Sequence, residues 1–186
     1  LKFSSKYEIV NTQKNSVFYI GTAGAKAFGR GDTINNLHVS EIAMWPEQER
    51  LMTGLLQSVP KDGNIVIEST ANGIGDYFWK ICNRARDGSS PFKFHFLPWF
   101  ELPGYVMPVT YPMELTPEEQ NLMNSYHLSR EQIDWRRWKI NQMNGDWQDP
   151  ATWDQFNQEF PATADEAFIV SGNPVFSPMA LRYYFS

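Results

Sequence analysis

Short apolar runs that resemble β-strands recur along the first hundred residues. Residues 7–10 and 17–21 form two such runs, joined by the polar segment 11–16. Residues 37–43 (LHVSEIA) and 64–69 (NIVIES) form two more, each with Val or Ile at its centre. Phe alternates with other side chains at residues 92–96. These short runs, bounded by turn residues, predict five strands.

Helical patterns lie between the later strands. Apolar residues recur at helical spacing between residues 51 and 56, behind Pro46, a residue type that suits the first turn of a helix. A second apolar helical face runs from residue 78 to residue 85 and is followed by Gly88. Strand, helix, strand, helix and strand with short connections predict an α/β domain with a largely parallel sheet.

The second half of the chain has a different pattern. Residues 98–112 are rich in Pro, and we interpret them as a boundary. Beyond it, Thr116–Glu119 and Ser129–Gln132 are capping-box sequences, which predict two helices in a hairpin, the second reaching about residue 144. Residues 145–186 are expected to be rich in loops, with a short helix at about 153–158. The chain therefore divides into residues 1–100 and a small, mostly helical part at 101–186.

Composition excludes several classes of protein. With 42% hydrophobic and 20% charged residues, the 186-residue chain can bury the core of one globular domain. No apolar run approaches the roughly 18 residues that a membrane span needs, so no membrane partner is expected. One cysteine, Cys82, cannot form an internal disulfide, and it is expected in the core on a helical face. Because it begins at Leu1 without a signal-peptide pattern, the chain is interpreted as a piece of a longer protein.

Charge is distributed unevenly. Residues 1–100 carry 11 Lys and Arg against 9 Asp and Glu, whereas residues 101–186 carry 5 against 12. Such an acidic second half would repel a phosphate backbone. The segment 135–139 (WRRWK) mixes aromatic and basic residues that could contact DNA, but Glu131 and Asp134 lie nearby, and local ion pairs with amphipathic packing are favoured.

Two polar segments follow the predicted strands at 37–43 and 64–69. Glu41, preceded by Ser40, comes at the carboxyl end of the first, and Ser69, Thr70 and Asn72 come at the end of the second. Each segment alone has an ordinary explanation, a solvated carboxylate for one and a capped turn for the other. Because the strands are separated by one helix, both segments are expected at the same edge of the sheet. This arrangement is typical of nucleotide hydrolases of the additional-strand P-loop type.

The sequences LHVSEIAMW (37–45), VIESTANG (66–73), SREQIDWRRWK (129–139) and QEFPATADEAF (158–168) together resemble the large terminase subunit of tailed bacteriophages. The late segment, which continues into residues 171–176 (SGNPVF), is the most specific of these. The resemblance covers roughly residues 15–180.

The resemblance implies a motor that pumps double-stranded DNA into a procapsid, using ATP and Mg²⁺. It implies that Glu41 is the catalytic carboxylate of a Walker B segment and that Ser40 acts on the metal indirectly, through water. Ser69 and Thr70 match the coupling motif, with Asn72 as a phosphate sensor. Arg30 matches an arginine that reaches a neighbouring subunit's ATP, although a surface arginine between two glycines is an equally ordinary reading.

The resemblance also indicates which segments of the family this chain lacks and which partners it is expected to bind. No GxxxxGK[ST] sequence occurs in the chain, and no acidic cluster of an RNase H-like nuclease follows residue 176. The fold class expected is therefore α/β: part of a P-loop ATPase sheet with flanking helices at 1–100, then a helical linker subdomain at 101–186, inactive in isolation. The implied partners are double-stranded DNA, the portal protein, the small terminase subunit and further copies in a ring, in the cytoplasm of the bacterial host.

Two alternatives remain open from the sequence. One is a non-enzymatic module that binds DNA or the portal, a remnant of such a motor in a degenerate prophage. The other is an unrelated α/β hydrolase-like or scaffold domain, in which Glu41 and Ser69 are ordinary strand ends.

Overall fold

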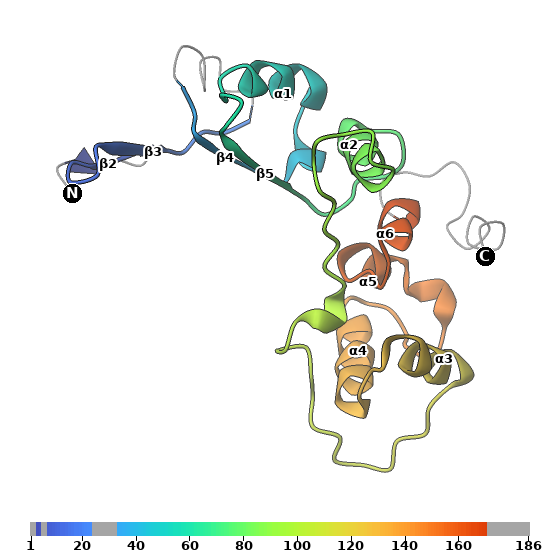
Figure 1. Cartoon of the computed structure of the whole chain (residues 1–186). Coiled ribbons are helices and arrows are strands. Elements are labelled where there is room, and N and C mark those ends of the chain that lie inside the picture. Colours follow the sequence, from blue (N-terminus) through green and yellow to red (C-terminus); the bar gives the residue numbers. More distant parts are fainter. Residues whose placement is uncertain (1–2, 5–6, 24–32, 171–186) are drawn as a thin grey trace. The chain divides into compact units, whose positions relative to one another are not determined.

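A computed structural model describes residues 3–4, 7–23 and 33–170 of the chain (Figure 1). The chain forms two compact units, Leu1–Ser69 and Thr70–Ser186. Among the described residues, the first unit contains the strands and one α-helix, and the second contains the other α-helices. The protein is therefore of mixed α/β class. The expected division at residue 100 concerns the domains of a longer protein, and it stays a prediction.

An antiparallel sheet opens the first unit. It contains β1 (Phe3–Ser4), β2 (Glu8–Asn11) and β3 (Ser16–Tyr19) in the order β1-β2-β3. The turn between β2 and β3 is organised by the Asn11 side chain, which accepts hydrogen bonds from the backbone N–H groups of Gln13 and Lys14. The two strands predicted near residues 7–10 and 17–21 are confirmed.

A parallel pair of strands forms the second sheet. β4 (Asn36–Ser40) pairs with β5 (Asn64–Glu68), and α1 (Gln48–Leu56) lies between them in the sequence and beside them in the unit (Figure 1). Backbone hydrogen bonds tie the start of this pair together, from the Asn64 amide to the Asn35 carbonyl oxygen and from the Ile34 amide to the Ser58 carbonyl oxygen. Both strands and the helix between them agree with the prediction.

The strand β4 ends earlier than the sequence predicted. It stops at Ser40, and a 3-10 helix (η1, Ile42–Met44) follows in place of the last strand residues. A strand places successive side chains on opposite faces, but Ile42 and Ala43 are both fully buried. A helical turn can bury two consecutive apolar side chains on one side, and this explains the early end.

The second unit begins with α2 (Tyr77–Arg86), where the Asp76 side chain caps the helix by accepting from the Trp79 amide. A 3-10 turn, η2 (Trp99–Glu101), comes later. The strand predicted at residues 92–96 is wrong. The three Phe residues there are half-buried between exposed neighbours, as in a strand, but no neighbouring strand pairs with them in the part of the chain that the structure describes.

Two capped helices form the centre of the second unit. In α3 (Pro117–Tyr126) and α4 (Arg130–Gln142), the N-cap hydroxyl and the N3 side chain bond reciprocally, so both predicted capping boxes are confirmed. His127 is the C-cap of α3 and adopts a left-handed conformation with φ 55°. The connection to α4 is correspondingly short.

The last described elements are a 3-10 turn η3 (Pro150–Thr152) and the helices α5 (Asp154–Glu159) and α6 (Ala164–Val170). The helix expected near residues 153–158 is confirmed as α5. The sequence reading missed α6, although Thr163 and Glu166 have capping-box spacing. The Glu166 amide donates to the Thr163 hydroxyl at 3.1 Å, so this signal was present in the sequence.

Aromatic side chains fill the core of the second unit. Trp99 stacks on Trp135 with ring centroids 5.4 Å apart, and Tyr105 stacks on the same indole at 4.2 Å. Phe156 and Phe160 pack around them from α5 and the residue after it. This aromatic core accounts for much of the high aromatic content. Across the described residues, the helices are all too short or too polar to cross a bilayer.

Candidate functional site

The ends of β4 and β5 bring together the two polar segments that the sequence analysis singled out. The strands are in register, Ser40 opposite Glu68, so Glu41 and Ser69 are the residues that directly follow two neighbouring parallel strands. The Ser69 hydroxyl accepts a hydrogen bond from the Ala43 amide at 3.1 Å, and this bond joins the two strand ends directly. The expectation that both segments leave the sheet at one edge is confirmed for Glu41 and Ser69.

Glu41 lies in a left-handed backbone conformation. Its φ is 56° and its ψ is 39°, in a region that non-glycine residues rarely adopt. The side chain is exposed, while the next two residues, Ile42 and Ala43, are buried. The chain therefore turns sharply at Glu41, burying the apolar residues and leaving the carboxylate in solvent. Strained residues of this kind are concentrated at functional sites, where the surrounding structure stabilises them.

Ser40 is the last residue of β4 and has an exposed side chain. Its carbonyl oxygen accepts a hydrogen bond from the indole Nε1 of Trp45 at 2.9 Å. The Ser40 carbonyl therefore stabilises the turn after β4, whereas its hydroxyl lies on the solvent-facing side of the sheet. Ser40 and Glu41 present two oxygen-bearing side chains at the carboxyl end of the same strand.

Polar pairs cover the exposed face of the two-stranded sheet. His38 Nε2 lies 3.4 Å from Glu68 Oε1, and the Asn64 side-chain amide donates to Asn36 Oδ1 at 3.0 Å. The sequence analysis missed both pairs. Asn36 and Asn64 lie directly opposite each other in the register, whereas His38 and Glu68 are diagonal neighbours, so only the alternation of exposed positions along each strand pointed to them in the sequence.

The remaining candidate residues lie outside the first unit or outside the described residues. Thr70 and Asn72 are exposed and belong to the second unit, which begins at Thr70. Gly73 follows with φ 93°, a conformation that favours glycine. Arg30 lies outside the described residues. The roles of these three side chains stay predictions.

The donor set at the strand ends suits a hard cation held partly through water. Carboxylate and hydroxyl oxygens are the groups that Mg²⁺ prefers, and the ion usually keeps several waters. The exposed oxygen atoms of Glu41 and Ser40 fit contacts with such an ion through water. They do not form a metal site of their own, since no group of three or more His, Cys, Asp or Glu residues gathers among the described residues.

The basic and aromatic segment of α4 is part of the core rather than a surface. Trp135, Arg136 and Arg137 are all buried, Lys139 is half-buried, and Trp138 is 44% exposed. The guanidinium of Arg136 lies 4.2 Å above the ring of Trp153. The segment therefore packs inward, as the favoured interpretation expected, and it does not offer its arginines to a nucleic-acid backbone.

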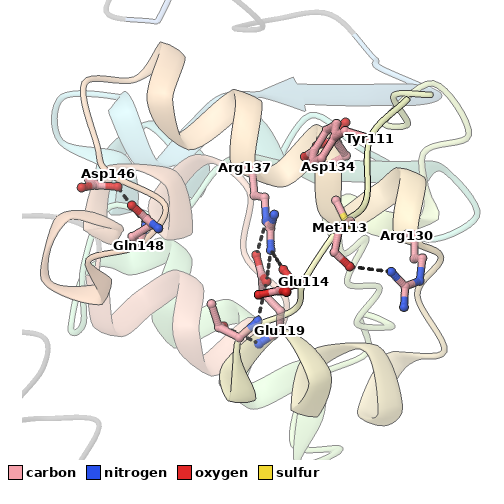
Figure 2. Close-up of polar contacts among 10 residues, drawn as sticks. Tyr111, Met113, Glu114, Glu119, Arg130, Asp134, Arg137, Asp146 and Gln148 are labelled. Atoms are coloured by element: carbon pink, nitrogen blue, oxygen red, sulfur yellow. Dashed lines mark hydrogen bonds and ion pairs between the residues drawn. The ribbon is translucent and has the colours of Figure 1, made fainter. Parts of the chain in front are cut away.

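Arg137 finds its partner on another helix, not among its neighbours on α4. Its Nε and Nη2 atoms donate to the Glu119 carboxylate at 2.7 and 2.5 Å, and Nη2 also donates to the Glu114 carbonyl oxygen (Figure 2). The hydrogen bond to Glu119 raises the pKa of Arg137. Nearby, Asp134 accepts from the Tyr111 hydroxyl, and this bond is the main reason that the pKa of Tyr111 is raised. The ion pairs expected with Glu131 and Asp134 are thus replaced by a buried pair between α3 and α4.

The late segment 158–168, the most specific part of the resemblance, has a structural role in the described chain. Phe160 packs against Trp135, and the Pro161 carbonyl oxygen accepts from the Trp99 amide. Farther along, Asp165 pairs with Arg86 at 2.5 Å, and Phe168 packs on Phe78 of α2. The segment therefore connects α2 to the aromatic core.

Comparisons of the chain with protein-family models, with curated proteins and with solved structures find no match.

Proposed function

We propose that the chain is part of a large terminase subunit, the ATP-driven motor that moves double-stranded DNA into a procapsid. In this proposal residues 1–100 belong to the second half of its P-loop ATPase domain, and residues 101–186 form the linker subdomain. The protein acts in the cytoplasm of the bacterial host, with the portal protein, the small terminase subunit and further copies of itself as partners.

The observation that carries the proposal is the in-register parallel pairing of β4 with β5. It supports the proposal because nucleotide hydrolases of this class need a carboxylate and a hydroxyl-bearing turn at one edge of a parallel sheet. Glu41 and Ser69 occupy this edge, joined through the Ala43 amide.

Each residue then has a defined role. Glu41 orients the attacking water and accepts hydrogen bonding from it, and its exposure leaves room for this water. Ser40 would hold waters around the Mg²⁺ that accompanies ATP, and this ion would supply positive charge beside the phosphates. Thr70 and Asn72 respond to the γ-phosphate, and Arg30 reaches the ATP of a neighbouring copy. The phosphate-binding loop lies outside this sequence, so the 186 residues alone hydrolyse no appreciable ATP.

The test uses the longer polypeptide encoded when the codons upstream of Leu1 are included. Glu41→Gln should lower its ATP turnover by about a hundredfold or more, the loss expected when a catalytic acid or base is removed. Binding of a fluorescent ATP analogue should stay within about twofold of the parent. Glu47→Gln is the matched control, because Glu47 is another exposed glutamate with a left-handed backbone, φ 48°. Turnover of the control should equal that of the parent.

Two results would contradict the proposal. If Glu41→Gln hydrolyses ATP as fast as Glu47→Gln, the strand ends are not a nucleotide site. If no in-frame Gly-Lys-Ser/Thr loop precedes Leu1, the non-enzymatic module that binds DNA or the portal becomes the better description.

A further inference from the structure

Several hydrogen bonds converge on the short segment 40–45 that carries Glu41. The Ser69 hydroxyl accepts from the Ala43 amide at 3.1 Å, two residues after Glu41. The Trp45 indole donates to the Ser40 carbonyl oxygen at 2.9 Å, one residue before it. The Met44 amide donates to the carbonyl oxygen of Glu41 itself at 3.0 Å. Two of these contacts come from side chains, and each lies on a different side of the glutamate.

The backbone of Glu41 needs such support. At φ 56° the Cβ of an L-residue crowds its own backbone, and only glycine adopts this region without a penalty. No side chain caps η1 at this position. The left-handed turn is therefore maintained by its neighbours. Ser69 and Trp45 bond the two sides of it. The Gln48 side-chain amide adds a bond to the Ala43 carbonyl oxygen at 3.0 Å.

We propose that Ser69 and Trp45 are positioning residues that hold Glu41 in its left-handed conformation and thereby direct its carboxylate. The structural part of this inference concerns the described chain alone, and its catalytic consequence rests on the proposed function. Ser69 thus acts through the backbone of the segment 40–45 rather than on a phosphate.

The first test measures the conformation of Glu41 by NMR in the 186-residue chain. A strong intraresidue HN–Hα NOE marks positive φ, and Glu41 should show it in the parent. Ser69→Ala should weaken it, and so should Trp45→Phe, which keeps an aromatic ring but removes the N–H donor. Ser69→Thr keeps a hydroxyl and should restore the parent signal. Thr53→Ala removes a hydroxyl that bonds within α1 and serves as the matched control.

The second test is a double-mutant cycle in urea. Glu41→Gly should raise the folding equilibrium constant by about two- to fivefold, because glycine accepts positive φ. Ser69→Ala should lower the folding equilibrium constant. The factor should be smaller in the Glu41→Gly background, because the turn then needs less support from the Ser69 hydroxyl. A merely structural hydroxyl would give the same factor in both backgrounds.

The third test uses the longer polypeptide and follows ATP turnover. Ser69→Ala and Trp45→Phe should each lower kcat by at least tenfold with KM within twofold, and Ser69→Thr should restore kcat. An unchanged NOE in both variants, together with additive urea factors, overturns the inference. If the NOE and the cycle behave as expected but kcat does not change, the positioning of the turn stands and the proposed function fails. If Ser69→Ala unfolds the first unit, Trp45→Phe and Ser69→Thr decide the same question.

Discussion

The buried ion pair between Glu119 and Arg137 offers the sharpest test of how the second unit is stabilised. The Glu119 side chain is almost wholly buried, with 1% of its surface exposed, and Arg137 is 6% exposed. The change to make is Glu119→Gln. It keeps the shape of the side chain and an oxygen that can still accept from the Thr116 amide in the capping box. What it removes is the negative charge beside a guanidinium that remains charged at every accessible pH.

The expected magnitude follows from the contacts that remain. Removing one partner of a buried pair lowers the free energy of unfolding by about 3–5 kcal/mol, because the other charge is left uncompensated. In Glu119→Gln the guanidinium keeps its bond to the Glu114 carbonyl oxygen and its contact with the Trp147 ring at 3.8 Å. We therefore expect the lower end of this range, about 3 kcal/mol, and a fall in Tm of about 10 °C.

The assay is urea unfolding followed by tryptophan fluorescence. Six of the seven tryptophans lie in residues 70–186, so the signal reports mainly on the second unit. Glu118→Gln is the matched control, an exposed glutamate one residue away, and it should change the free energy by less than about 0.5 kcal/mol. A double variant, Glu119→Leu with Arg137→Met, should recover most of the loss because it leaves no buried charge.

The reasoning is refuted if Glu119→Gln destabilises the second unit by less than about 1 kcal/mol, since the buried charge would then be compensated by other groups. It is equally refuted if the control loses as much stability as Glu119→Gln. Either result would mean that burial of the ion pair does not govern how much it contributes to the free energy of unfolding of the second unit.

Further predictions concern other parts of the chain. Burial is the main reason that the pKa of Cys82 is raised to about 11, so the native thiol should resist a thiol reagent at pH 8 and react readily in urea. Because this pKa lies above its unfolded value, stability should fall as pH rises from about 9 towards about 11, as urea unfolding at several pH values would show. Gly54→Ala should stabilise the first unit by about 1 kcal/mol, because the added methyl group meets no atom within 4 Å on α1. Gly63→Ala should destabilise it by about 1–3 kcal/mol, because its Cβ would lie 2.6 Å from a side-chain methyl carbon and 3.1 Å from two carbonyl oxygens. In α6, Phe168→Ala should lower Tm far more than Asp165→Asn in thermal melts of the two variants. Phe168→Ala removes a buried aromatic side chain, at a cost of about 3–5 kcal/mol. Asp165→Asn breaks an exposed ion pair worth about 1 kcal/mol or less.

Local sequence signals predicted most of the elements. The capping boxes at Thr116 and Ser129 located the starts of α3 and α4, because the reciprocal bonds involve residues only three apart. The Val- and Ile-rich runs located β4 and β5. The prediction failed at residues 92–96, where alternation of Phe with exposed residues describes burial on one side but cannot supply a neighbouring strand.

The candidate site was predictable in part. The spacing of the strands placed Glu41 and Ser69 at one edge, and the structure agrees. The bond from the Ala43 amide to the Ser69 hydroxyl was not predictable, because it depends on β4 ending at Ser40 and on the left-handed turn that follows.

By itself, the sequence determined the elements whose stabilising contacts lie within a few residues, namely the capped helices, the turns and the apolar strands. Tertiary structure alone decided which charges are buried and which face solvent. Arg137 lies among neighbours of opposite charge on α4, yet its partner is Glu119 on α3, because a guanidinium removed from water needs a carboxylate within hydrogen-bonding distance in space. The distance between Arg137 and Glu119 is fixed only by the packing of α3 against α4, and spacing along the chain does not reveal it.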